Sequence, residues 1–184
     1  ADVHVKHENH TPIGAFKVRG GVTYMDWLKR AGPKASGVIS ATRGNHGQSI
    51  ALAGRRAGLP VTILVPHGNS VEKNAAMEGF GAELIVHGRD FDEAKDYAAH
   101  LAKERKLHFV PSFDAMLVKG VATYALELFR AVPDLHTVYA PIGMGSGICG
   151  TIMARDLLGL KTRIVGVCAA NAPANALSFA AGRP

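Results

Sequence analysis

The chain has 184 residues, of which 47% are hydrophobic and 20% charged, which is long enough to bury one sizeable core or two small lobes that share one. The formal net charge is +6, but the basic residues are scattered and aromatic residues make up only 7%, which argues against a nucleic-acid surface built from clustered charge and stacking rings. No apolar stretch is long enough to span a bilayer, and the two cysteines, Cys149 and Cys168, favour a reducing compartment. We therefore expect a cytoplasmic protein that has neither membrane nor nucleic-acid partners.

Short β-branched runs alternate with longer stretches of helical spacing along the chain. Ser70 and Asp90 are expected to cap helices, and Gly58 and Gly81 to end them. In chain order we expect a strand at 3–5, a helix at 17–30, a strand at 37–41, a helix at 46–57, a strand at 61–65, a helix at 71–80, a strand at 84–86, a helix from Asp90 to Arg105, a strand at 108–110, a helix at 119–131, a strand at 137–140, a helix at 151–158 and a strand at 163–167.

Strict alternation of strands and helices predicts an α/β fold with parallel sheets, right-handed crossovers and helices on both faces. No proline- or serine-rich linker divides the chain, so we expect any second lobe to be interwoven with the first. In such sheets ligands bind beyond the carboxyl ends of the strands. Two glycine-punctuated stretches lie there, residues 42–47 and 143–150.

The stretch "PIGMGSGICG" follows an expected strand and precedes an expected helix. Its glycines let backbone N–H groups converge on one point, and a helix N-terminus adds partial positive charge, which favours a phosphate cradle. It is not a Walker A loop, because no Lys-Ser/Thr pair follows, and its single fit to G-x-G-x-x-G, through Gly145, Gly147 and Gly150, is weak. A tight turn that binds nothing is the alternative interpretation.

The stretch "SATRGNHGQ", residues 40–48, is a second junction of strand, loop and helix. Thr42 offers a hydroxyl and Asn45 an amide, and the N–H groups at the helix start can hold a carboxylate. The alternative is a capped helix in which Thr42 or Asn45 only satisfies the backbone. His46 taken alone is more typical of packing than of catalysis.

The stretch "TPIGAFKVRGG" places Lys17 directly after apolar residues. Burial disfavours the charged amine, so the pKa of such a lysine falls and the neutral amine can form a Schiff base with a carbonyl. Together with a phosphate cradle, this lysine indicates a phosphorylated aldehyde, for which pyridoxal phosphate is the natural candidate. A surface lysine whose stem packs beside Phe16 is the alternative.

The three stretches in this order resemble fold-type II pyridoxal-phosphate enzymes, and most closely the threonine/serine dehydratases, with serine racemases as near relatives. The resemblance implies a fold like that of the tryptophan synthase β subunit, with two interwoven lobes. Residues 1–30 and 124–184 would be part of the larger cofactor lobe, and 31–123 would form the smaller lobe. The smaller lobe carries the family's asparagine loop, which the stretch "TRGNHGQ" resembles. Members of the family are longer at the C-terminal end, so we expect the C-terminal part, including the partner of the pyridine nitrogen, to be absent from this chain.

The resemblance also implies roles for individual residues. Lys17 falls on the cofactor-linked lysine, and Phe16 falls where the family packs a ring against the cofactor. Asn45 would contact the ring hydroxyl. The substrate carboxylate would be held by Thr42, Gly44, Asn45 and His46, with Arg43 either reaching an acidic group of the substrate or pointing to solvent, which we favour. The phosphate would bind the loop formed by Gly143, Met144, Gly145, Ser146 and Gly147.

Several positions depart from the family pattern. Ala15 replaces the usual serine before Phe-Lys, which removes a hydroxyl near the Schiff base. Met144 and Ser146 interrupt four glycines, although the backbone donors survive both changes. Cys168 and Ala174 fall where some relatives place the acidic ligands of a structural magnesium or calcium ion, so we expect no metal there.

The resemblance implies a lyase that converts L-threonine or L-serine into a 2-oxo acid and ammonia. The alternatives are an amino-acid racemase, which needs a second acid that the Ala15 departure affects, and a truncated or inactive homologue that binds the cofactor without turnover. A β-replacement enzyme is less favoured, because His46 follows Asn45 where that class usually has threonine. By resemblance alone we expect a homo-oligomer with a small amino acid as substrate.

Overall fold

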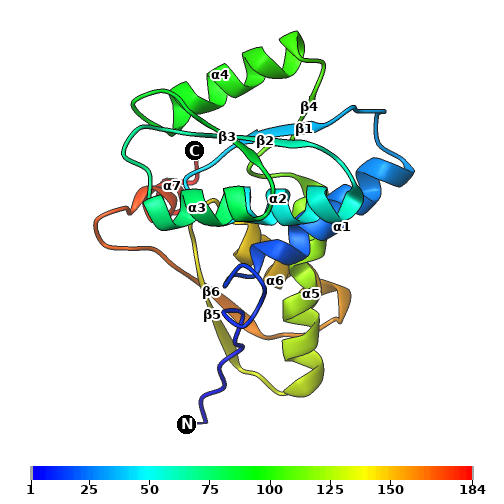
Figure 1. The fold of residues 1–184 in the computed structure, drawn as a ribbon. Helices are drawn as coiled ribbons and strands as arrows, with labels where there is room; N and C mark the ends of the chain where they lie inside the picture. The colour runs from blue at the N-terminus through cyan, green and yellow to red at the C-terminus, as the bar shows by residue number, and fades with distance from the viewer. Residues whose placement is uncertain (1, 184) are drawn as a thin grey trace. The chain divides into compact units, whose positions relative to one another are not determined.

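The computed structural model describes residues 2–183 and confirms an α/β fold with parallel strands and flanking helices (Figure 1). Helices and strands alternate along the described chain after the first helix. Their bounds are α1 Lys17–Arg30, β1 Val38–Ala41, α2 Asn45–Ala57, β2 Val61–Val65, α3 Val71–Gly79, β3 Glu83–Val86, α4 Phe91–Glu104, β4 His108–Phe109, α5 Ala115–Ala131, β5 Thr137–Pro141, α6 Ser146–Leu157, β6 Arg163–Val167 and α7 Ala174–Ala181. None of the helices in the described range is both long and apolar enough to cross a bilayer.

The chain divides into two compact units, of which the first ends at Gly120 and the second begins at Val121. Helix α5 contains this boundary, so its first residues belong to one unit and the rest to the other. The grouping of residues 1–30 with 124–184 in one lobe stays a prediction.

The first unit contains a four-stranded parallel sheet in the order β3-β2-β1-β4. Val38 of β1 pairs with Val61 of β2 on one side and with His108 of β4 on the other. Strand β4 therefore lies beside the first strand in sequence, and the sheet grows outward from β1 in both directions. At its carboxyl end, the central strand β1 leads directly into the loop before α2.

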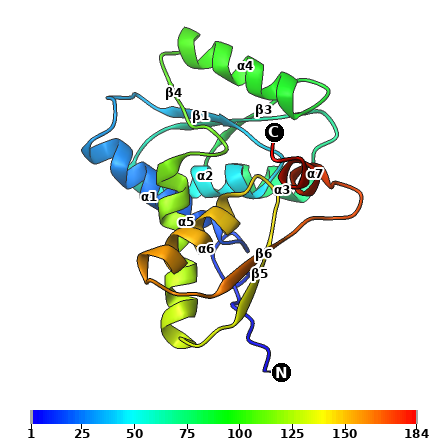
Figure 2. The same cartoon turned by 180° about the vertical axis from the view of Figure 1, so that it is seen from behind.

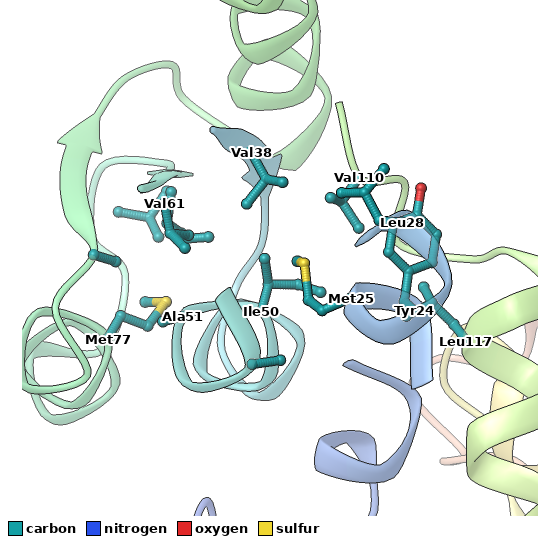
Figure 3. Close-up of a cluster of buried hydrophobic side chains, with 14 residues drawn as sticks. Tyr24, Met25, Leu28, Val38, Ile50, Ala51, Val61, Met77, Val110 and Leu117 are labelled. Atoms are coloured by element: carbon teal, nitrogen blue, oxygen red, sulfur yellow. The ribbon is translucent and has the colours of Figure 1, made fainter. Parts of the chain in front are cut away.

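Both faces of this sheet are covered, as Figures 1 and 2 show, with α4 on one face and α1, α2 and α3 on the other. Alternate side chains of a strand point to opposite faces, so Val38 packs toward α1 and α2 whereas Ile39 packs toward α4. Figure 3 shows the larger cluster, in which Met25 and Ile50 meet between α1 and α2. Burial on both faces explains why the two inner strands, β1 and β2, are mostly apolar along their whole length.

The second unit contains the parallel pair β5-β6, with Thr137 opposite Arg163. Phe129, Ala125 and Ala154 form its buried cluster. Gly150 of α6 permits a close approach to α5, because a Cβ there would lie 2.9 Å from the backbone nitrogen of Ala122.

The observed elements differ from expectation in several places. Residues 3–5 form no strand, and Val3 and Val5 remain exposed, since no neighbouring strand in the described chain pairs with them. Helix α6 begins at Ser146 and not at 151, because Gly145 adopts a left-handed φ of 93° and turns the chain directly into the helix. Helix α7 was not expected at all.

Candidate active site

Lys17 is the first residue of α1, directly after the N-cap residue Phe16. It is half-buried, and its Nζ lies 5.5 Å from the centroid of the Phe16 ring. Desolvation by burial lowers the pKa of Lys17 below its ordinary value. The structure therefore gives this amine the property that a nucleophilic lysine needs, a larger neutral fraction at a given pH.

The turn before α1 is closed by one hydroxyl group. Thr11 Oγ1 accepts a hydrogen bond from the Ala15 amide at 2.9 Å and donates one to the Ala15 carbonyl at 2.9 Å. Gly14, within this turn, has a φ of 63°, which favours glycine. The turn therefore fixes the direction from which the chain enters Phe16 and Lys17.

The asparagine loop connects β1 to α2 and is held from inside by Thr42. This buried side chain accepts hydrogen bonds from the amides of Gly44, at 3.0 Å, and Gly47, at 3.2 Å. Thr42 thus satisfies backbone amides of the loop, as the alternative interpretation of its role predicted. The Asn45 and His46 amides have no acceptor within the described part of the chain, as is usual in the first turn of a helix, and are available to an anion.

The outer side of the loop is formed by polar and basic side chains. Arg43 and Asn45 are exposed. Lys73 of α3 covers Gly44, because a Cβ at Gly44 would lie 2.6 Å from Lys73 Cδ and 3.0 Å from Nζ. Helix α2 has no acidic residue in its first turn, so the loop carries positive charge only.

His46 is buried beneath this loop and is uncharged. Ser40 Oγ donates a hydrogen bond to the Val110 carbonyl at 2.7 Å and lies 3.0 Å from His46 Nε2. Since the Ser40 proton is used toward Val110, Nε2 must carry the proton of the imidazole and donate it to Ser40. Burial, and then the positive charge of Lys17, lower the pKa of His46 to about 3, against an opposing contribution from the Val110 carbonyl.

Helices α1 and α2 bring Lys17 and the asparagine loop together within the first unit. Ser49 Oγ donates a hydrogen bond of 2.6 Å to the Lys17 carbonyl. The electrostatic effect of Lys17 on His46 is a second sign that the two side chains are close. Of the expected site residues, the first unit therefore brings together Lys17 of α1, Asn45 and His46 of α2, and Thr42 and Gly44 in the loop before α2.

The glycine-rich stretch 143–147 lies in the second unit, where it connects β5 to α6. Gly143 and Met144 are exposed, whereas Ser146 and Gly147 are buried in the first turn of α6. Nothing lies within 4 Å of a Cβ placed on Gly143, so the surface above this residue is open. That first turn also has no acidic residue, which leaves its positive end uncompensated by its own side chains.

Two sets of side chains hold the carbonyl groups of this loop. Tyr124 and Thr151 each place a hydroxyl 3.0 Å from the Gly147 carbonyl, and the two hydroxyls lie 2.8 Å apart. Asn175 Nδ2 donates to the Gly143 carbonyl at 3.0 Å. These contacts fix the backbone of the loop at Gly143 and Gly147.

Sequence reasoning missed the residues that support the site. Ser40 had a usable signal, because a hydroxyl on a strand buried on both faces needs a partner. Ser49, Lys73 and Tyr124 gave none, since their contacts join residues far apart in the sequence. No group of three or more histidine, cysteine or acidic residues in the range 2–183 is arranged to hold a metal ion.

The chain is similar to known proteins along most of its length. A family model described as "Pyridoxal-phosphate dependent enzyme" matches residues 1–184. A biosynthetic L-threonine dehydratase of Haemophilus influenzae is 36% identical over 167 residues, which are 90% of this chain and 32% of that protein. An L-threonine ammonia-lyase of Geobacter sulfurreducens is 37% identical over 182 residues, which are 98% of this chain and 45% of that protein.

Solved structures agree with the fold. The processed form of threonine deaminase isoform 2 from Solanum lycopersicum superposes with a TM-score of 0.88 at 32% identity, over 96% of this chain and 52% of that one. Maize serine racemase superposes with a TM-score of 0.88 at 26% identity, over 96% of this chain and 54% of that one. The chain spans about a third to a half of the length of the curated relatives it matches. Its match to the family model along its entire length shows that the chain belongs to the family of pyridoxal-phosphate dependent enzymes.

Proposed function

We propose that the protein to which this chain belongs is a pyridoxal-phosphate dependent dehydratase that converts L-threonine or L-serine into a 2-oxo acid and ammonia. The observation that carries the proposal is the desolvated amine of Lys17, tied through Ser49 to the helix that begins with the asparagine loop. The threonine dehydratases and ammonia-lyases among its relatives support the reaction class.

The residues present fit the cofactor. A lysine whose pKa is lowered can carry an aldehyde covalently, and Lys17 meets that requirement. An open loop of backbone donors before a helix whose first turn has no acidic residue can hold a phosphate. Residues 143–147 of the second unit meet this requirement. In the proposal Phe16 packs against the cofactor ring and Asn45 contacts its hydroxyl.

The substrate carboxylate would bind at the start of α2. The Asn45 and His46 amides are available there, and Thr42 holds the loop in the conformation that presents them. Because His46 is neutral and buried, it adds no charge to this site and acts through its backbone and its packing. Arg43, which is exposed, would contact only a substrate with a longer polar side chain.

Pyridoxal phosphate, when bound, supplies a ring that accepts the electron pair left at the substrate α-carbon. The chain's own contribution is the proton transfer at Lys17 Nζ. The amine is held in place by α1 and can accept the α-proton in its neutral form, and its lowered pKa raises the fraction in that form. The partly buried surroundings disfavour the charged form of the amine, which is the cause of its lowered pKa.

The test is a pair of lysine substitutions in the complete enzyme. Lys17→Ala is expected to abolish both the visible absorbance of the bound cofactor and the formation of 2-oxo acid from threonine or serine. Lys29→Ala, on the same helix but exposed and bonded only to the Ala57 carbonyl, should keep both. If borohydride still fixed the cofactor to the Lys17→Ala protein, the proposed role of Lys17 would be wrong.

A racemase is the second candidate, supported by the maize serine racemase structure and by a pyridoxal 5'-phosphate-dependent aspartate racemase at 31% identity and a TM-score of 0.79, over 88% of this chain and 49% of that one. Ala15, in the turn before Lys17, offers no hydroxyl to return a proton on the opposite face, which favours dehydration. Chiral chromatography of the amino acid beside a 2-oxo-acid assay separates the two reactions. A cofactor-binding homologue without turnover would show the absorbance and neither product.

The remaining parts of the proposal concern assembly, location and metals. We expect a homo-oligomer in the cytoplasm, the location being supported by two free cysteines, Cys149 and Cys168. We also expect no structural divalent ion, since the positions Cys168 and Ala174 lack carboxylates. A rise in melting temperature on adding micromolar Ca²⁺ or Mg²⁺ would contradict this.

A further inference from the structure

We propose that Ser49 is a positioning residue that holds the first turn of α1, and with it Lys17, against the helix of the asparagine loop. This inference rests on the proposed role of Lys17 as the cofactor lysine. It adds to the proposed site a residue that fixes the distance between the cofactor lysine and the carboxylate site.

The contact joins the two functional segments directly. Ser49 is 1% exposed, and its hydroxyl donates a 2.6 Å hydrogen bond to the carbonyl of Lys17. In α2, Ser49 lies three and four residues after His46 and Asn45, so all three are on one side of the helix. The Ser49 hydroxyl is therefore on the side of α2 that begins with the carboxylate site.

Gly21 makes room for this contact. It follows Lys17 by four residues, so the two share one face of α1. A Cβ at Gly21 would lie 2.2 Å from Ser49 Oγ and 2.8 Å from the Ser49 carbonyl oxygen. Only glycine at this position lets α2 approach closely enough for the serine to reach the lysine carbonyl one turn earlier.

The position of Lys17 in its helix explains why it needs such a tether. Terminal turns of helices fray, because they have fewer hydrogen bonds than the interior. No side chain caps the start of α1 at Phe16. Fraying would admit water to the Lys17 amine, whose low proton affinity depends on burial. By fixing the backbone of Lys17, Ser49 keeps the amine desolvated.

The test measures Lys17 itself. In the complete protein freed of cofactor, the labelling of Lys17 by a small amine-specific reagent is followed by mass spectrometry as a function of pH. The titratable group that faces Lys17 from α2 is His46, which is neutral above a pH of about 3, so it does not change the profile at higher pH. Ser49→Ala is expected to move the midpoint upward by about half a pH unit or more, since the amine gains water.

Thr23→Ala is the matched control. Thr23 is also on α1 and its hydroxyl also donates to a backbone carbonyl, that of Arg19, at 3.0 Å. It should lower stability by about as much as Ser49→Ala and leave the Lys17 profile unchanged. Gly21→Ala, which displaces Ser49, should move the profile in the same direction as Ser49→Ala and also lower the melting temperature.

An unchanged Lys17 profile in both Ser49→Ala and Gly21→Ala would overturn the inference and leave Ser49 a packing residue. In the loaded enzyme, Ser49→Ala should lower kcat about tenfold with little change in KM, because a misplaced base slows chemistry more than binding. The labelling experiment needs no turnover. Failure of the proposed function would appear as cofactor bound to the Lys17→Ala protein, whereas failure of this inference would appear only in the profile.

Discussion

Arg19 donates two hydrogen bonds to the carboxylate of Glu8, from Nε to Oε2 at 2.7 Å and from Nη2 to Oε1 at 2.9 Å. Arg19 lies two residues after Lys17 in α1, whereas Glu8 precedes the helix in a segment without regular structure. Lys6 also contacts this carboxylate, at 2.8 Å. The pair therefore fastens the N-terminal segment to the helix that presents the candidate lysine.

Glu8→Gln is expected to cost about 1 kcal/mol of stability at neutral pH, because a charge-assisted two-point contact becomes a neutral one. Although burial acts to raise it, the hydrogen bonds from Arg19 and Lys6 lower the pKa of Glu8 below the ordinary 4.5. The carboxylate thus stabilises the fold above that pH and loses its effect as the pH falls through its lowered pKa. Urea unfolding at several pH values should show the cost of the substitution shrinking below pH 4.5, with the exposed Glu78→Gln as the matched control.

His46→Gln is expected to flatten the dependence of stability on acid. Because the pKa of His46 is about 3 in the fold and 6.5 as its ordinary value, the unfolded chain binds a proton between these limits that the folded chain does not. Stability is therefore lost as the pH falls through this window, by about 1.4 kcal/mol for each pH unit. Glutamine can still donate to Ser40 but does not titrate.

The measurement is the difference in unfolding free energy between pH 7 and pH 5 for each protein. Wild type should lose about 2 kcal/mol more than the His46→Gln variant over this interval. The exposed His100→Gln is the control for replacing a histidine. Equal losses in all three proteins would mean that His46 is protonated in the fold.

Gly47→Ala is expected to destabilise the protein by about 1–3 kcal/mol and to distort the asparagine loop. A Cβ at Gly47 would lie 2.4 Å from Met77 Sδ and 2.4 Å from Thr42 Cγ2, and both side chains are buried. Displacing Thr42 would release the amides that it holds, so affinity for a substrate carboxylate should fall as well.

Gly79→Ala is the control for this substitution. Gly79 also lies in a helix, α3, but nothing is within 4 Å of its added Cβ, so alanine should be neutral or stabilising there. Melting curves and substrate-analogue titrations of the two variants provide the measurement. A Gly47→Ala protein as stable as wild type would show that the packing around the loop relaxes easily.

Tyr124→Phe and Thr151→Val are expected to be mild singly and severe together. Each hydroxyl can donate to the Gly147 carbonyl, and each can replace the other when one is removed. With both absent, the loop of residues 143–147, which is the proposed phosphate site, loses its side-chain anchors at that carbonyl. A double-mutant cycle on cofactor affinity should therefore give a loss larger than the sum of the single losses, and strict additivity would contradict the shared role.

The sequence by itself determined the kind of fold and the identity of the candidate residues. Alternation of apolar runs and helical spacing is a local property, and each strand and helix of the first unit's sheet follows from it. The order of the Lys17, Asn45 and Gly143 stretches indicated the family, which the match to its model confirmed. The strand expected at residues 3–5 failed, because a strand needs a partner that no local pattern supplies.

Only the tertiary structure decided how the site residues are supported and charged. The neutral state of His46 depends on its burial and on the nearby charge of Lys17, which belongs to another helix. The closeness of Lys17 to the asparagine loop depends on Gly21 admitting Ser49. Such contacts join residues distant in the chain, and proton affinity depends on burial, so neither can be read from neighbours in the sequence.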